Sequence, residues 1–156
     1  MKKILFYFSM SAMLIFASCE SHTVYKQIEK LPDYRMLRDT SFVFEFDNQN
    51  PLEVYDVVLM FRYVHGFQFK QAVFNFEYLS PVGDSIDFTF GIPIVGQDGK
   101  YIGDGSGDIW DVEHTVISKR ALPQGKNTFV ITNQMQPDLE YIPNVMAVGL
   151  KLVQVK

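Results

Sequence analysis

The stretch YIGDGSGDIWD, at residues 101–111, combines residue types that could hold a ligand. It alternates three glycines with acids, Asp104 and Asp108 among them, and it includes Trp110, the single tryptophan of the chain. Glycine-rich loops can cradle a phosphate with their backbone N–H groups, and regularly spaced carboxylates can bind calcium. The stretch therefore has to be compared with the motifs for both kinds of site.

Neither motif fits. A Walker loop requires G-x-x-x-x-G-K-[ST], but the Gly-Lys pairs at 99–100 and 125–126 lack the first glycine and the hydroxyl residue after the lysine. A calcium loop of the EF-hand type beginning at Asp104 requires glycine at its sixth position and glutamate at its twelfth. The chain has Ile109 and Thr115 at those positions. The sequence therefore supports neither a phosphate site nor an EF-hand here.

A glycine-shaped turn that leads into a strand at residues 109–110 is the structural interpretation of this stretch, because glycine accepts a positive φ without strain. The functional interpretation is a contact with a protein partner or a cation. Its candidate residues are Asp104, Asp108 and Trp110, provided that the three side chains face solvent together. The two interpretations differ in whether Trp110 is exposed or packed into the fold.

The segment DVEH, at residues 111–114, brings two carboxylates and an imidazole close together in sequence. In a strand Asp111 and Glu113 share one face while His114 points to the other, which does not suit a shared metal ion. No pair of carboxylates can be assigned to glycoside hydrolysis, because the sequence gives no distance between separate strands. We predict no catalytic residue, no metal site and no cofactor; a hydrolase stays open as an alternative.

The N-terminus has the organisation of a secretory signal peptide over residues 1–18. Lys2 and Lys3 precede an apolar stretch that is shorter than the roughly 18 residues of a membrane-spanning helix. Small residues before Cys19, the single cysteine of the chain, resemble a bacterial lipobox. This predicts cleavage before Cys19 and attachment of palmitate and further acyl chains, which together would hold the protein on its membrane. The alternative is an ordinary signal peptide in which Cys19 has no such role.

The charge balance argues against nucleic acid as a partner. Without Lys2 and Lys3 the chain keeps 12 basic residues against 18 acidic ones, and no basic cluster offsets the difference. A surface that binds nucleic acid needs a concentration of lysine and arginine. The same balance argues against anionic lipid as a partner surface.

Apolar residues alternate with polar ones in most of the chain, as in half-buried strands. The runs SFVFEF, VFNFEYL, SIDFTF and NTFVIT show this period, and VYDVVLMFRYV is apolar enough to be covered on both faces. Turn sequences rich in glycine, proline, asparagine and aspartate separate the runs. The pattern predicts an all-β fold, an antiparallel β-sandwich of about seven or eight strands over residues 31–156. Residues 19–30 are predicted to be a tether of roughly 15–20 Å that contains a first short element.

Several motifs occur in an order that resembles the gliding-motility lipoprotein family GldH of the Bacteroidetes. They are VYKQIEKLP, SFVFEF, YDVVLMFRY, DGKYIGDGSGDIWD, LPQGKNTFVITNQM and IPNVMAVGLKL, spread over residues 24–153. The resemblance implies a non-enzymatic envelope lipoprotein, accessory to gliding and to the machinery that secretes surface proteins. Its partners would be the membrane, through Cys19, and other envelope proteins. We expect it at the outer membrane, facing the periplasm.

A glycan-binding envelope lipoprotein with a β-sandwich fold is the alternative function. Exposed aromatic rings can stack on sugars, and Tyr101, Trp110 and Tyr141 lie near predicted turns. Such a site would need two or three coplanar exposed rings on one face. The sequence does not show whether these three residues share a face.

Overall fold

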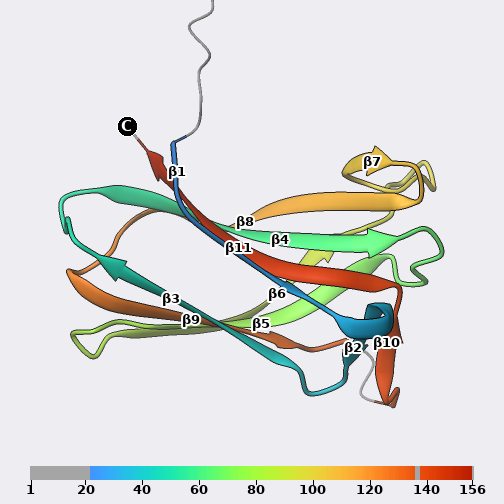
Figure 1. The fold of residues 1–156 in the computed structure, drawn as a ribbon, viewed down its shortest axis with the longest axis horizontal. Coiled ribbons are helices and arrows are strands. Elements are labelled where there is room, and N and C mark those ends of the chain that lie inside the picture. The colour runs from blue at the N-terminus through green and yellow to red at the C-terminus, as the bar shows by residue number, and fades with distance from the viewer. Residues whose placement is uncertain (1–21, 136–137, 156) are drawn as a thin grey trace, which may run out of the picture.

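The molecule is a sandwich of two antiparallel sheets, with a two-stranded ribbon at one end (Figure 1). A computed structural model of the chain describes residues 22–135 and 138–155. Every strand pairing among these residues is antiparallel. The predicted all-β antiparallel sandwich is therefore confirmed. The signal peptide over residues 1–18 and the lipid attachment residue Cys19 lie outside the described residues.

The larger sheet has five strands in the spatial order β1-β11-β4-β8-β7. Its strands are β1 (His22–Lys30), β11 (Val145–Val155), β4 (Val54–Val64), β8 (Ile109–Ala121) and β7 (Asp104–Ser106). The smaller sheet has four strands in the order β3-β9-β5-β6. Its strands are β3 (Ser41–Asn48), β9 (Gly125–Asn133), β5 (Gln71–Leu79) and β6 (Ser85–Pro93). The ribbon pairs β2 (Arg35–Leu37) with β10 (Tyr141–Pro143), next to the short 3-10 helix η1 (Pro32–Tyr34).

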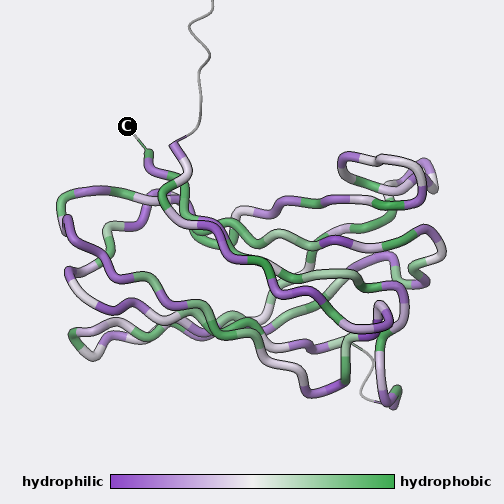
Figure 2. The backbone as a smooth tube through the Cα atoms, in the orientation of Figure 1, coloured by the Kyte–Doolittle hydropathy of each residue, from purple (hydrophilic) through white to green (hydrophobic). Residues whose placement is uncertain are grey.

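The core lies between the two sheets and is built by alternation along the strands. In β5, Phe74 and Phe76 are fully buried, while Asn75 between them lies on the outer face. Figure 2 shows the same alternation as repeated changes of colour along several strands. Aromatic rings fill much of the interior; Phe76, for example, lies 5.4 Å from Phe88 and 6.2 Å from Phe129, measured between ring centroids. The high aromatic content of the sequence is therefore largely core packing.

Three details differ from the prediction. The sequence predicts a tether over residues 19–30, but from His22 onward this segment is the edge strand β1, paired with β11 over its whole length. The described residues contain eleven strands rather than seven or eight, because β1 and the three-residue strands β2, β7 and β10 add to those that the pattern predicts. Strand β4 also differs, since only one of its faces is fully buried; Met60 and Arg62 on the other face are half-buried.

The hydroxyl groups of Tyr55 and Tyr63 lie at the edge of the interior, although both residues are at most 1% exposed. The pKa of each phenol is raised to about 12, mainly by burial. Tyr55 donates a hydrogen bond to Glu53 Oε2 at 2.7 Å, and this hydrogen bond and the negative charge of the carboxylate are part of the rise in the pKa of Tyr55. Tyr63 donates a hydrogen bond to the carbonyl oxygen of Ile102 at 2.9 Å.

The free energy of unfolding should therefore fall in alkaline solution. A phenol whose pKa is raised in the folded state contributes its stability in full below the unfolded value near 10, and loses it as the pH rises through about 12. We expect Tyr55 and Tyr63 each to remove about 2 kcal/mol of unfolding free energy across this window. Denaturant titrations at several pH values measure the loss. Between pH values near 10 and 12 the Tyr63→Phe variant should lose less unfolding free energy than the wild type. An equal loss would contradict the contribution assigned to the Tyr63 phenol.

Candidate partner-binding site

The glycine-rich stretch forms a β-hairpin at one edge of the five-stranded sheet. Strand β7 pairs with the beginning of β8, and Ser106 lies opposite Ile109, so Gly107 and Asp108 alone make the turn. Gly107 has a φ of 62°, and glycine at the first central position is typical of a tight hairpin turn. The prediction of a glycine-shaped turn that leads into a strand is confirmed.

Trp110 belongs to the inner side of this hairpin. It lies opposite Tyr63, which is fully buried, and its ring is 5.5 Å from that of Tyr101. The ring also covers Gly105 on the neighbouring strand, where an added Cβ would lie 2.9 Å from Trp110 Cζ3. Gly105 therefore leaves the space that the indole occupies, and Trp110 packs against the core rather than standing free in solvent.

Asp104 lies on the opposite side of the hairpin. It is paired in register with Asp111, one position along β8 from Trp110, and successive strand residues point to opposite faces. Asp108 is exposed at the turn, and its carbonyl oxygen accepts a hydrogen bond from the N–H of His65 at 2.7 Å. The structure therefore brings Asp104 and Asp108 to the surface of one hairpin, but it does not place Trp110 beside them.

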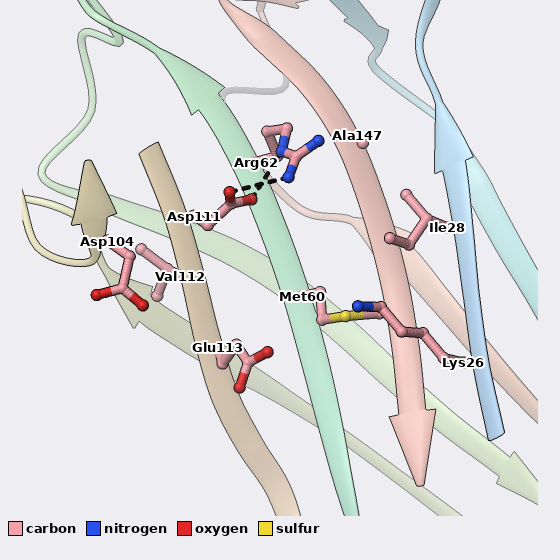
Figure 3. A pocket seen from close by; sticks show the side chains of 9 residues that line it. All are labelled: Lys26, Ile28, Met60, Arg62, Asp104, Asp111, Val112, Glu113 and Ala147. Atoms are coloured by element: carbon pink, nitrogen blue, oxygen red, sulfur yellow. Dashed lines mark hydrogen bonds and ion pairs between the residues drawn. The ribbon is translucent and has the colours of Figure 1, made fainter. Parts of the chain in front are cut away.

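The outer face of the five-stranded sheet holds a shallow depression of about 210 Å³ (Figure 3). Its apolar floor contains Met60 of β4, Ile28 of β1 and Ala147 of β11. At Gly149 of β11 an added Cβ would lie 2.9 Å from both Ile28 Cγ1 and Met60 Cε. The missing side chain at Gly149 thus allows these two residues to close over β11 from both sides. Charged residues surround the floor: Lys26, Arg62, Asp104, Asp111 and Glu113.

Two ion pairs neutralise the middle of this face. Arg62 donates to both carboxylate oxygens of Asp111, through Nε at 2.7 Å and Nη2 at 2.9 Å, and these hydrogen bonds raise the pKa of Arg62 above its usual value. Lys151 Nζ donates to Glu113 Oε2 at 2.6 Å. Both side chains of the first pair are nearly half-exposed, so water screens it and its contribution to stability is about 1 kcal/mol or less. The pairs mainly fix the positions of the charges.

The two ends of the depression carry opposite charges. In the described part of the chain, neither Lys26 on β1 nor Asp104 on β7 makes an ion pair or a side-chain hydrogen bond. Figure 3 shows the Lys26 side chain extending across β11 toward Met60, and Asp104 on the far side of β8. Strands β1 and β7 are four strand spacings apart, which is about 19 Å. A ligand on this face would meet the Lys26 ammonium beside the apolar floor and the Asp104 carboxylate beyond β8.

Of the residues in the segment DVEH, His114 lies apart from this face. His114 points inward and stacks on Phe90, with ring centroids 5.6 Å apart, whereas Asp111 and Glu113 point outward as predicted. Across residues 22–135 and 138–155, no group of three or more histidine, cysteine, aspartate or glutamate side chains is arranged to hold a metal ion. The same residues include no helix with the length and apolar character needed to cross a bilayer.

The three aromatic residues considered for sugar binding do not form a common platform. Tyr101 and Trp110 contact each other at an interplanar angle of 55°, and both are half-buried against the core. Tyr141 lies in the ribbon, where the guanidinium carbon of Arg35 is 4.8 Å from the centre of its ring. No observation on these residues favours a glycan site.

Lys26, Met60 and Arg62 were not candidates from the sequence. Of these three residues, Arg62 alone could have been recognised from the sequence, because it is the single basic residue in the long apolar run of residues 54–64. A charge within such a strand indicates that one of its faces reaches solvent. Lys26 carries no such signal, since its place beside the depression depends on the pairing of β1 with β11.

Fold and site together define a small β-sandwich domain with a charged, partly apolar sheet face. Residues 23–152 match the family described as GldH lipoprotein. The chain therefore belongs to the GldH lipoprotein family, and the family resemblance of the sequence is confirmed. A relative described as "Gliding motility lipoprotein GldH homolog", from Christiangramia forsetii, is 26% identical over 97 residues. The matched region covers 62% of this chain and 59% of the relative.

Proposed function

We propose that the protein is a non-enzymatic accessory lipoprotein that acts through protein contacts in gliding motility and in the associated secretion of surface proteins. Membership of the GldH lipoprotein family is the observation that supports a lipoprotein of the GldH type. The relative from Christiangramia forsetii is named for gliding motility, and this name supports a role of the present protein in that process. The mature chain would be held by lipid on Cys19 at the outer membrane and would face the periplasm.

The outer face of the five-stranded sheet is the surface proposed for the partner. Its depression combines an apolar floor with charges that lack partners at its two ends, Lys26 and Asp104. Complementary charge steers association and fixes the orientation of a partner, while apolar contact supplies affinity. The occupant is an envelope protein with an acidic side chain for Lys26, a basic side chain for Asp104 and an apolar stretch between them.

Charge reversal at each end of this face tests the proposal. Lys26→Glu and Asp104→Lys should each lower the recovery of the partner from crosslinked envelopes about tenfold, since a contact of roughly 1.4 kcal/mol corresponds to that factor. The measurement is quantitative mass spectrometry of proteins that co-purify with each variant. Both positions are exposed, so we expect the variants to fold as the wild type does.

Glu77→Lys is the matched control. It introduces the same kind of charge change at a strand position on the outer face of the four-stranded sheet, opposite Asp87. Recovery with this variant should equal that of the wild type. If the wild type recovers no motility or secretion protein, the proposed function is wrong. If the control weakens recovery as much as the two reversals do, the proposed surface is wrong.

A further inference from the structure

One end of the sandwich gathers the start of β1, the end of β11 and two exposed loops. His22 lies opposite Gln154, and Val155 in turn lies opposite Val54 at the start of β4. The loop of residues 49–53, which joins β3 to β4, therefore lies at this end, and so does the loop of residues 80–84, which joins β5 to β6. In Figure 1 the two loops form the left margin of the sandwich, and β1 begins above and to the right of them, beside the end of β11. We call this the anchor end.

The predicted lipid attachment residue is very close to the anchor end along the chain. Cys19 precedes His22, the first residue of β1, by three positions. Three residues span at most about 11 Å even when fully extended. The strand β4 and its preceding loop are two strand spacings from β1, or about 10 Å. A lipid on Cys19 would therefore hold the start of β1 and the loop of residues 49–53 close to the bilayer surface, and the loop of residues 80–84 lies at the same end in the other sheet.

The tips of the two loops are apolar. Leu52 is 89% exposed and Val82 is 67% exposed, the two highest values among the exposed large apolar side chains of the described residues. Each follows a proline, Pro51 or Pro81, while Glu53 directly follows Leu52 and Asp84 lies two residues after Val82. Single exposed apolar residues are common on protein surfaces. Two such tips at the end that carries the predicted anchor would both lie close to the lipid bilayer.

The backbone N–H groups of Leu52 and Val82 already have partners within the chain. The N–H of Leu52 donates to Asn50 Oδ1 at 3.1 Å, and the N–H of Val82 donates to Ser80 Oγ at 3.2 Å. Ser80 also accepts from Gly83 through its carbonyl oxygen at 3.1 Å, which closes the second loop on itself. An unpaired N–H group is costly to transfer out of water, and these two groups do not carry that cost. Desolvation of these two N–H groups therefore does not oppose insertion of the tips.

We propose that Leu52 and Val82 insert into the interfacial layer of the lipid bilayer that holds the Cys19 anchor. The sandwich then rests on the membrane on its anchor end, with the ribbon of β2 and β10 pointing away from the surface. The proposal rests on the lipid attachment in the proposed function, and it adds a second contact with the membrane. This contact orients the domain and sets which of its faces a partner in the periplasm can reach.

An environment-sensitive fluorophore at single cysteines tests the contact. The lipidated full-length protein has no free thiol, because Cys19 is the single cysteine of the chain, so Leu52→Cys and Val82→Cys each provide one labelling site. The labelled proteins are reconstituted into vesicles of phosphatidylethanolamine and phosphatidylcholine, which carry no net charge. Leu37→Cys is the matched control, since Leu37 is apolar and 61% exposed but belongs to β2, away from the anchor end.

We expect the labels at 52 and 82 to emit at shorter wavelength and to lose intensity when the lipids carry brominated acyl chains. The label at 37 should emit as it does in water. Equal emission at all three positions, whether quenched or unquenched, would overturn the proposal. Binding of the unlabelled protein to the vesicles tests the lipid anchor separately. Recovery of the partner protein with the charge-reversal variants tests the proposed function. A failure of this contact is thus distinguishable from a failure of either.

Discussion

The Cys19→Ala variant is expected either to leave the membrane fraction as a mature protein or to remain an unprocessed precursor. Acyl chains on this residue are the predicted membrane anchor, and a chain that carries two or more of them stays bound while an unlipidated one does not. Without the thiol, lipid cannot be attached, so the product is either a soluble mature protein or an unprocessed precursor. The contact through Leu52 and Val82 is too small to retain the domain alone. Fractionation of cells, followed by the intact mass of the protein, measures both outcomes.

Ser21→Ala is the control for this prediction. It changes a small polar residue two positions after the cysteine and leaves the attachment chemistry in place. This variant should remain in the membrane fraction with the same mass shift as the wild type, apart from the substitution. A Cys19→Ala protein that is cleaved and still fractionates with membranes would show that the lipobox interpretation is wrong.

The Phe76→Ala variant is expected to lose about 3–5 kcal/mol of unfolding free energy, because removal of a buried phenyl ring leaves a cavity in a packed core. Phe76 is fully buried in β5 and contacts the rings of Phe88 and Phe129. A domain of this size has a total of roughly 5–15 kcal/mol, so the loss is a large part of its stability. Denaturant unfolding followed by circular dichroism measures the difference.

Phe88→Ala provides the comparison at the edge of the same cluster. Phe88 lies on the edge strand β6 and is only partly buried, so the same change should cost about 1 kcal/mol. The ratio of the two effects tests the position of the core between the sheets. Equal losses for Phe76→Ala and Phe88→Ala would mean that the centre of the core does not lie at β5.

The sequence predicts the long strands well, because burial on one face imposes a period of two. Strand β3 shows this directly, since Phe42 and Phe44 are buried while Val43 between them is half-exposed. Strand β1 shows no such period because it is an edge strand with both faces largely in solvent. Strands β2, β7 and β10 have three residues each, too few for an alternation to be recognised. Their pairing comes from the tertiary structure, not from a local pattern.

The candidate site was predictable only in part. Asp104 and Asp108 are at the surface of the hairpin, but the register of β7 against β8 sends Trp110 to the opposite side. The turn sequence alone does not set this register, and a shift of one residue would exchange the two faces. The depression joins Lys26 and Met60 with residues of β8, which are about 50 or more positions further along the chain. Such a combination depends on strand order, which a single sequence does not provide.

Site-specific photo-crosslinking in the intact envelope tests the central claim most directly, namely that the outer face of the five-stranded sheet contacts an envelope protein. A photoreactive residue is placed at position 104 on this face, or at position 77 on the outer face of the other sheet. We predict a discrete crosslinked product with a motility or secretion protein from position 104 and none from position 77. The account would be contradicted if position 104 gave no product, or if both positions gave the same one.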